Sequence, residues 1–381
     1  MHLSPTDTSL EVGGLLAEAR RRTDAVIAPL LERVDPASAR VLAYQWGGRD
    51  AEGRVVAEDG RGRGKAVRAA LVFAAARATG NPLDGDSGGE GDGAGSALLR
   101  AGAAAVELLH TLSLMHDDVM DGDELRRGRP AAWRVFGPGA VEDAVAALTP
   151  HALDLVFTAT GEDAGADAGA GPSVPDLGVL RAASRSAGLL GEALVRLLQG
   201  QALDLALEDE ACPEVTATLR VHADKTASLF ACACALGAAS GTADDLAAFG
   251  EHLGTAFQIV DDLLGVWGDP TVTGKPVGAD LTARKKSHPV AVALSSDPAR
   301  ADPAVSRRLR ELYALSGPWT PAQQEEVRRL VDLSGARAVS RAVARAHERA
   351  ALAALARVCP PSRAAGADLR ALAAFVTGRA Y

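Results

Sequence analysis

Residues 106–130 read VELLHTLSLMHDDVMDGDELRRGRP, an apolar pattern that runs into a cluster of aspartates and then into a cluster of arginines. Val106, Leu109 and Leu112 recur at helical spacing, which predicts a helix that continues through Met120. This segment combines a buried helix with charged groups at its end. It therefore decides both the fold class and the chemistry that we expect.

The carboxylates at the end of this helix form one compact group. Asp117 and Asp121 are four residues apart and share a face, Asp118 lies beside them, and His110 lies seven residues earlier on that face. Carboxylates this close repel one another unless a cation compensates, and Mg²⁺ commonly bridges one or two carboxylates and substrate phosphates. Such phosphates would also explain the arginines that follow, Arg126, Arg127 and Arg129. The alternative is a solvated acidic helix end before a basic turn.

A second acidic segment occurs at 257–269, which reads FQIVDDLLGVWGD. Asp261 and Asp262 are embedded in an apolar helix, where uncompensated carboxylates are expensive, and Gln258 lies three residues before them. Two such clusters on different helices predict an all-α bundle around a central active-site cavity that holds several Mg²⁺ ions and a diphosphate.

The composition agrees with an all-α protein. The chain has 381 residues, 48% of them hydrophobic but only 4% aromatic, and helix formers dominate. A net charge of −9 argues against nucleic acid as a partner. We find no apolar run of transmembrane length and no signal peptide, which predicts a cytoplasmic protein. We expect a first helix or extension over 1–40, and a single domain over 41–381 with flexible loops near 84–96 and 160–177.

These motifs, in this order, resemble the trans-type isoprenyl diphosphate synthases of the polyprenyl synthetase family, over about residues 60 to 295. HDDVMDGDELRRGRP resembles the first aspartate-rich motif, and FQIVDDLLGVWGD with TGKPVGADLTARKKSHP resembles the second with its lysine loop. GRGKAVRAAL at 62–71 resembles the glycine-lysine-arginine motif, and LLQGQALDL with HADKTASLF resembles the middle of the chain.

The resemblance implies a Mg²⁺-dependent prenyltransferase that condenses isopentenyl diphosphate with an allylic diphosphate. Asp117, Asp118 and Asp121 would hold two Mg²⁺ ions and Asp261 a third, with Mn²⁺ as a possible substitute. Isopentenyl diphosphate would be bound by Lys65, Arg68, His110 and Arg127. Arg126 would bind the allylic diphosphate. The same group, or the cation that it forms, would be contacted by the catalytic Lys225, by Gln258 and by Lys275, with Thr226 beside them. Asp262 and Lys285 are further expected substrate-binding residues.

Product length is expected to depend on Leu112, five residues before the first aspartate, and on its neighbour Ser113. Neither is aromatic, so the resemblance favours the C20 product geranylgeranyl diphosphate over longer products and over C15. A homodimer is also implied.

The sequence departs from the family pattern at several positions. Gly265 replaces the third aspartate of the second motif, Ala69 replaces a proline, and Thr149 and Pro150 replace a Gly-Asp pair. Pro150 is expected to end or kink its helix. Two alternatives stay open. A class I terpene cyclase would share the helical fold and the first aspartate motif but would not need the isopentenyl diphosphate residues. The departures at Gly265, Thr149 and Pro150 suggest a weakly active regulatory subunit of a heteromeric synthase.

Overall fold

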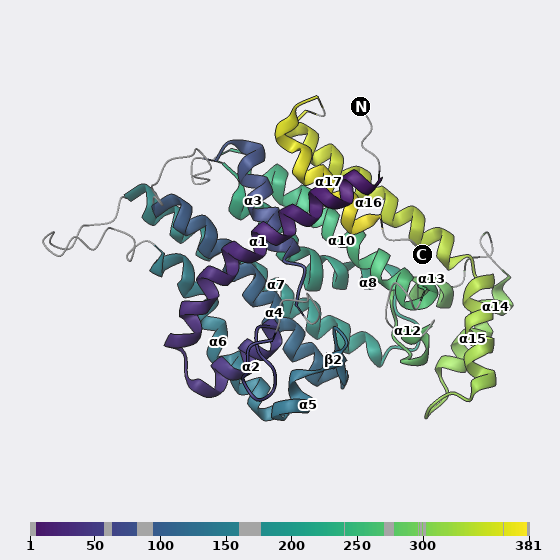
Figure 1. Ribbon diagram of the computed structural model, residues 1–381. Coiled ribbons are helices and arrows are strands. Elements are labelled where there is room, and N and C mark those ends of the chain that lie inside the picture. The colour runs from purple at the N-terminus through teal and green to yellow at the C-terminus, as the bar shows by residue number, and fades with distance from the viewer. Residues whose placement is uncertain are drawn as a thin grey trace, which may run out of the picture. The chain divides into compact units, whose positions relative to one another are not determined.

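The computed structural model of the chain describes residues 5–56, 63–81, 94–159, 177–239, 241–269, 278–295, 297, 299, 302–360 and 362–378. The chain runs through α1 (Pro5–Arg33), α2 (Pro36–Trp46), α3 (Val67–Thr79), α4 (Ala94–Asp121), β1 (Leu125–Arg126), β2 (Arg129–Pro130), α5 (Ala132–Phe136), α6 (Pro138–Thr158), α7 (Leu177–Glu208), α8 (Val215–Val221), the π-helix η1 (His222–Ala227), α9 (Ser228–Gly237), α10 (Ala243–Trp267), α12 (Ala279–Thr282), α13 (His288–Leu294), α14 (Pro303–Tyr313), α15 (Pro321–Leu333), α16 (Ala336–Val358), the 3-10 helix η2 (Ala364–Gly366) and α17 (Ala367–Thr377) (Figure 1).

The expected all-α fold is confirmed. Within the described residues the only sheet is the two-stranded hairpin β1–β2, whose strands have two residues each. The helices fall into two compact units. The first comprises Met1–Glu192, Cys232–Leu246 and Val358–Leu372, and the second comprises Ala193–Ala231, Ala247–Arg357 and Ala373–Tyr381. The segment 1–40 belongs to the first unit, whereas the segment 41–381 contributes to both.

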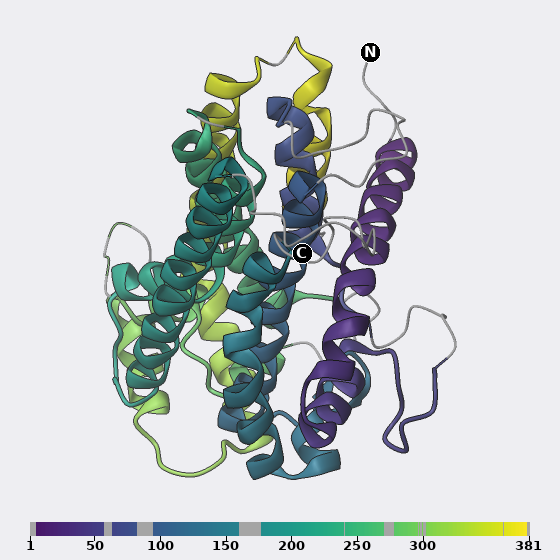
Figure 2. The same ribbon diagram turned by 90° about the vertical axis from the view of Figure 1, so that its left-hand side faces the viewer.

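In the first unit, α4 is the central helix and packs against α1, α3 and α6 (Figure 2). Its alanine-rich stretch Ala103–Leu109 is almost fully buried, and most of the alanines of α3 are buried as well. Small side chains let these helices approach closely, so the charged end of α4 is held on a rigid support.

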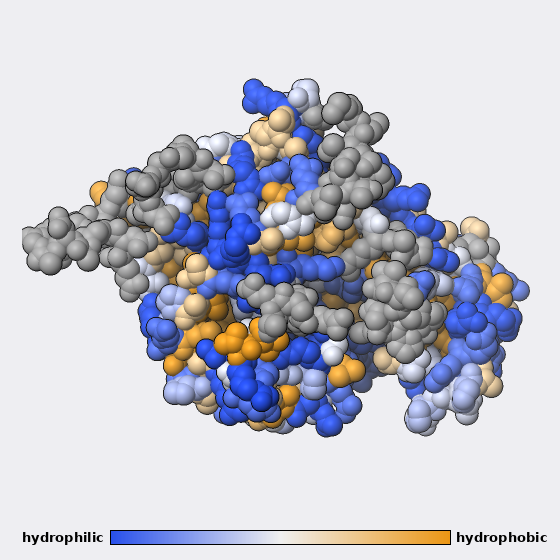
Figure 3. Space-filling model, in the orientation of Figure 1, coloured by the Kyte–Doolittle hydropathy of each residue, from blue (hydrophilic) through white to orange (hydrophobic). Residues whose placement is uncertain are grey.

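The apolar character of α4 corrects one expectation. Over Gly95–Asp121 this helix is long and apolar enough to cross a membrane by length and composition, although the sequence was expected to contain no such run. The relevant window is 78% buried inside the protein, which is typical of a core helix. The view of the surface in Figure 3 shows many hydrophilic side chains with small apolar patches between them.

In the second unit, α13 packs against α8, α14 and α15 around a shared apolar core. Helix α14 is capped by Asp302, and α15 begins with a capping box formed by Thr320 and Gln323. Helix α8 continues without a break through η1 into α9. A π-helical turn inside a longer helix is rare and often marks a functional site, and this one contains Lys225 and Thr226.

The two expected loops and the expected break at Pro150 differ in part from the helix bounds of the structure. The loop expected over 84–96 is shorter, because α4 already begins at Ala94, and the rest of it lies outside the described residues. The loop over 160–177 also lies outside them except for Leu177, which begins α7. Pro150 does not end its helix, since α6 runs through it to Thr158.

Candidate active site

The glycine-lysine-arginine segment forms a tight turn into α3. Ala66 has a φ of 54°, a left-handed conformation that is costly for a residue with a side chain. The carboxylate of Glu107 on α4 accepts hydrogen bonds from the backbone N–H groups of Arg68 at 2.9 Å and Ala69 at 3.1 Å. Glu107 therefore caps α3 and holds this strained turn against α4. Sequence reasoning missed Glu107, although a carboxylate inside an apolar helix was a signal for it.

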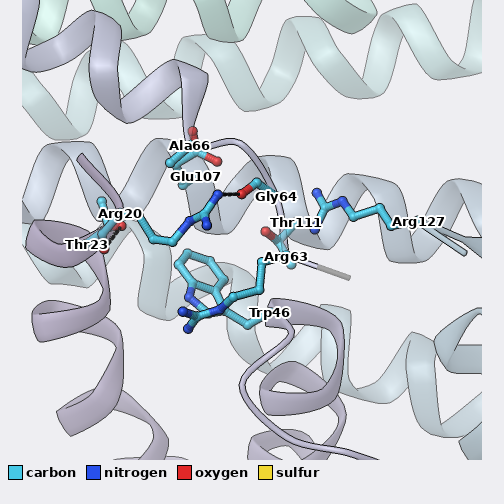
Figure 4. Close-up of a pocket in the computed structure, with 9 residues that line it drawn as sticks. All are labelled: Arg20, Thr23, Trp46, Arg63, Gly64, Ala66, Glu107, Thr111 and Arg127. Atoms are coloured by element: carbon cyan, nitrogen blue, oxygen red, sulfur yellow. Dashed lines mark hydrogen bonds between the residues drawn. The ribbon is translucent and has the colours of Figure 1, made fainter. Parts of the chain in front are cut away.

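A pocket opens beside this turn, and α1 forms part of it (Figure 4). Its lining residues are Arg20, Thr23, Trp46, Arg63, Gly64, Ala66, Glu107, Thr111 and Arg127. Arg20 donates a hydrogen bond to the carbonyl oxygen of Gly64, and Arg63 pairs with Asp24 at 3.2 Å. Arg20 and Arg63 are additional cations at this pocket that the sequence reasoning did not single out.

Arg127 reaches this pocket from the hairpin β1–β2. The two-residue turn between the strands consists of Arg127 with a φ of 54° and Gly128 with a φ of 74°, as a type I′ turn requires. A β-carbon on Gly64 would lie 2.9 Å from Nη2 of Arg127, so the guanidinium packs where a larger residue would not fit. The strained turn thus presents the arginine to the pocket.

The charges in this pocket favour an anion. The pKa of Arg68 is lowered to about 10, mainly by burial; the charge of Glu107 opposes this shift and the charge of Arg127 adds to it. Burial, and then the charges of Arg68, Arg127 and Arg126, hold the pKa of His110 well below 6.5. The imidazole of His110 is therefore neutral at pH 7. Clustered arginines of this kind attract an anion such as a diphosphate.

The first aspartate cluster lies on the same helix as His110. Asp118 is only 1% exposed, and its Oδ1 accepts hydrogen bonds from Arg126, with 2.8 Å to Nε. Its Oδ2 has no hydrogen-bond partner within the described part of the chain. Burial raises the pKa of the Asp118 carboxyl, which Arg126 only partly offsets. Asp117 is half-buried and Asp121 is exposed, so the carboxylates of this cluster differ in accessibility.

In the second unit, close helix packing positions Lys225. A β-carbon on Gly200 of α7 would collide with the backbone nitrogen of Lys225, so the glycine lets α7 touch η1. One turn later, Asp204 pairs with Nζ of Lys225 at 2.8 Å. Gly254 of α10 gives a similar close contact, because its β-carbon would lie 2.6 Å from Cα of Ala227. The π-helical turn is thus clamped between α7 and α10.

Asp262 lies at the centre of a buried hydrogen-bond network. Its carboxylate accepts from Nε2 of His222 at 2.9 Å, from the backbone N–H of His288 at 3.0 Å and from Nε2 of Gln258 at 3.1 Å. Gln258 in turn accepts from the hydroxyl of Thr226 at 2.8 Å. Burial acts to raise the pKa of the Asp262 carboxyl, but these partners outweigh it and hold that pKa below 3.8. Sequence reasoning did not anticipate His222 or His288.

The local packing around Gly265 leaves no room for the aspartate that the family usually has at this position. The carboxylate of Asp280 on α12 occupies the space that a β-carbon on Gly265 would need. An aspartate at position 265 could not coexist with Asp280 in its present place. The departure from the family pattern is therefore matched by the local packing.

The remaining predicted residues are placed as follows. Lys65 and Lys285 are exposed, and Asp261 is exposed at the surface of α10. Leu112 is 2% exposed, and Ser113 donates to the carbonyl oxygen of His110 at 2.9 Å. Lys275 lies outside the described residues.

The donor set of the first cluster fits a divalent cation. Asp118 has a buried oxygen without a hydrogen-bond partner among the described residues, and carboxylate oxygens are the ligands that Mg²⁺ prefers. Across the described ranges, no three His, Cys, Asp or Glu side chains converge into a metal site on their own. A cation here would therefore take its remaining ligands from water and from a phosphorylated substrate.

Comparisons with known proteins agree with this chemistry. The sequence pattern of the Polyprenyl synthetase family matches residues 57–332. Geranylgeranyl diphosphate synthase of Mycobacterium tuberculosis is 38% identical over 96% of this chain and 93% of that protein. (2E,6E)-farnesyl diphosphate synthase of Mycobacterium bovis is 35% identical over 98% and 94%. A polyprenyl synthetase structure from Streptomyces coelicolor aligns with a TM-score of 0.78 at 35% identity, covering 96% of this chain and 99% of that one.

The chain therefore belongs to the polyprenyl synthetase family. It is a prenyltransferase with the all-α isoprenoid synthase fold, as the motifs indicated.

Proposed function

We propose that this prenyltransferase condenses isopentenyl diphosphate with an allylic diphosphate to give a longer all-trans prenyl diphosphate, with C20 geranylgeranyl diphosphate as the product that we expect. One observation carries the proposal: α4 holds both the neutral His110 beside the arginine pocket and, seven residues on, the carboxylates of the first cluster. A single rigid helix thus presents an anion pocket and candidate metal ligands side by side.

In this proposal the pocket binds the diphosphate of isopentenyl diphosphate. Arg68 and Arg127 supply charge, Lys65 reaches from the exposed side of the turn, and His110 contributes a neutral hydrogen-bonding ring. Arg20, which holds Gly64, keeps the turn in place. The alternative reading as a terpene cyclase leaves this pocket without a role.

Mg²⁺ is the proposed cofactor, because the family is Mg²⁺-dependent and the donor set fits it. Asp117, Asp118, Asp121 and Asp261 are its proposed ligands. When bound, Mg²⁺ neutralises the leaving diphosphate and so favours cleavage of the allylic carbon–oxygen bond. Arg126 gives charge to the same diphosphate, and its present bonds to Asp118 keep its guanidinium in place beforehand.

On the other side of the reaction, we propose that Lys225, Thr226 and Gln258 contact the allylic diphosphate or the cation formed from it. Their support is the clamped π-helical turn, in which Thr226 and Gln258 are joined by a hydrogen bond of 2.8 Å. Lys275 and Lys285 remain proposed diphosphate contacts on the resemblance alone.

The proposed C20 length rests on Leu112 and Ser113, which are not aromatic and so leave room for a growing chain. Relatives with C20 and with C15 names are about equally similar, at 38% and 35% identity. The product must therefore be measured. We further propose a cytoplasmic homodimer. In it, a second copy of the chain would cover the exposed apolar residues Val195 and Leu198 of α7.

The test is product analysis of the purified protein with Mg²⁺, labelled isopentenyl diphosphate and, in turn, dimethylallyl, geranyl and farnesyl diphosphate. We expect a labelled C20 diphosphate, loss of activity with a chelator and recovery on adding Mg²⁺. Asp117→Asn should lower the rate by at least 100-fold, the order typical for a group that stabilises transition-state charge. The exposed Asp143→Asn on α6 is the matched control and should leave the rate unchanged.

Other results would replace the proposal. A cyclic hydrocarbon formed from an allylic diphosphate alone would indicate a cyclase. No elongation with any primer would indicate a regulatory subunit, and size-exclusion chromatography with light scattering would show whether a homodimer forms.

A further inference from the structure

Asp262 is adjacent to Asp261, yet the two carboxylates are in different environments. Neighbouring residues on a helix point about 100° apart. Asp261 is exposed, whereas Asp262 is only 7% exposed and receives three N–H donors. Its Oδ2 takes the bonds from His222 and His288, and its Oδ1 takes the bond from Gln258. Both carboxylate oxygens therefore accept hydrogen bonds from within the protein, and the donors lie on η1, α13 and α10.

This arrangement fixes the direction of every hydrogen bond that follows. An ionised carboxylate can only accept, so the amide of Gln258 must turn its NH₂ toward Asp262. Its oxygen then faces Thr226, whose hydroxyl must donate across the 2.8 Å contact. The hydrogen of Thr226 is thereby committed to Gln258. The lone pairs of the Thr226 oxygen are what the side chain can still offer to a ligand.

We propose that Asp262 is a positioning residue: it fixes the orientation of the Gln258 amide and, through it, makes the Thr226 hydroxyl an acceptor toward the substrate. The inference rests on the proposed function and deepens it, because it assigns Asp262 to the support of Thr226 and not to contact with substrate or metal. His222 belongs to the same device, since its Nε2 holds the carboxylate from the π-helical turn.

Asp262→Asn keeps the size of the side chain but reverses the directions of the hydrogen bonds that run through Gln258 to Thr226. The asparagine oxygen can accept from His222 and His288, which leaves its NH₂ facing Gln258. The Gln258 amide then turns over so that its oxygen accepts from Asn, and its own NH₂ faces Thr226. Thr226 must accept that bond, and its hydroxyl hydrogen points to the ligand. A developing positive charge would meet a hydrogen where it previously met lone pairs.

The kinetic test compares wild type, Asp262→Asn, Thr226→Val and the double variant. We expect Asp262→Asn to lower kcat about tenfold and to change the KM for isopentenyl diphosphate less than twofold. The same change should cost less than twofold in the Thr226→Val background, because valine has no hydroxyl to reorient. A cost that is equal in both backgrounds would show that Asp262 does not act through Thr226 and would overturn the inference. Asp244→Asn, exposed on the same helix, is the matched control.

A second measurement needs no catalysis. Urea unfolding of Asp262→Asn, Gln258→Leu and their double variant forms a cycle that reports whether the two side chains interact. We expect the combined loss to differ clearly from the sum of the single losses, and additive losses would overturn the network. If wild type fails to elongate any primer, the proposed function falls and this inference with it. If wild type elongates but the cycles are additive, only this inference falls.

Discussion

At the scale of single residues, Arg127 shows how function is built into backbone strain. It sits at the first central position of a type I′ turn with a φ of 54°, where asparagine or glycine is the usual choice. A left-handed conformation costs an ordinary residue roughly 1 kcal/mol or more. An arginine is found there because its guanidinium reaches the pocket beside Gly64.

We therefore predict that Arg127→Asn separates stability from activity. The free energy of unfolding should stay equal or rise by up to about 1 kcal/mol, because asparagine tolerates the left-handed region. The KM for isopentenyl diphosphate should rise by at least tenfold, because a pocket arginine is lost. Urea unfolding and steady-state kinetics measure the two quantities, with the exposed Arg21→Asn as control. An unchanged KM would remove Arg127 from the binding site.

A second prediction at this scale concerns Leu112. It is 2% exposed and lies on α4, five residues before Asp117. Leu112→Phe should shorten the main product from C20 to C15, because an aromatic ring blocks the path of the growing chain. Chromatography of the dephosphorylated products measures this. Leu112→Met conserves volume and is the control that should keep the wild-type product. An unchanged product in the phenylalanine variant would place the floor of the chain pocket elsewhere.

At the scale of elements, glycines decide how closely the helices around η1 approach. Gly200 is the clearest case, because any side chain there would meet the backbone of Lys225. In an isolated helix, Gly→Ala is stabilising by roughly 1 kcal/mol. The packing against η1 should reverse that sign.

We predict that Gly200→Ala destabilises the protein by about 1–3 kcal/mol, the cost typical of overpacking, and lowers kcat because Lys225 and Thr226 are displaced. Gly188→Ala on the same helix is the matched control. No described atom lies within 4 Å of a β-carbon at Gly188, so this change should be neutral or stabilising. Thermal unfolding and kinetics measure both. Equal effects of the two substitutions would contradict the close contact between α7 and η1.

At the scale of the whole molecule, buried histidines make stability depend on pH. Burial is the main cause that lowers the pKa of His288 to about 4 and the pKa of His110 well below 6.5. Above pH 6.5 these groups are neutral in the folded and the unfolded chain. Below pH 6.5 these histidines bind protons in the unfolded chain but stay neutral in the folded protein. The free energy of unfolding therefore falls as the pH is lowered.

We predict that the free energy of unfolding decreases between pH 6.5 and 5 by up to about 1.4 kcal/mol per pH unit for each of these two histidines. Urea unfolding at several pH values measures this slope. His288→Gln should make the slope shallower than that of the wild type. A slope that His288→Gln does not alter would contradict the burial of a neutral His288.

The sequence alone predicted much of this molecule because its signals are local. Helical periodicity predicted α4, and carboxylates inside an apolar helix marked Asp262 as costly. Contacts between distant segments could not be predicted in this way. Glu107 caps α3 from 39 residues away, and Arg20 reaches Gly64 over a separation of 44 residues. The distinct environments of Asp261 and Asp262 likewise depend on His222 and His288, which belong to other helices.

The arginine pocket of Figure 4 has a consequence for how long the protein survives. Arg127 lines this pocket and repels the charge of Arg68 nearby in the folded state, and a bound diphosphate would relieve this repulsion. Ligand that binds only the folded state at 100 times its Kd adds about 2.7 kcal/mol to the free energy of unfolding. Cellular proteases degrade the unfolded fraction. The abundance of the enzyme would therefore follow the supply of its diphosphate substrate. A cell that runs short of isoprenoid units would also lose the catalyst that consumes them.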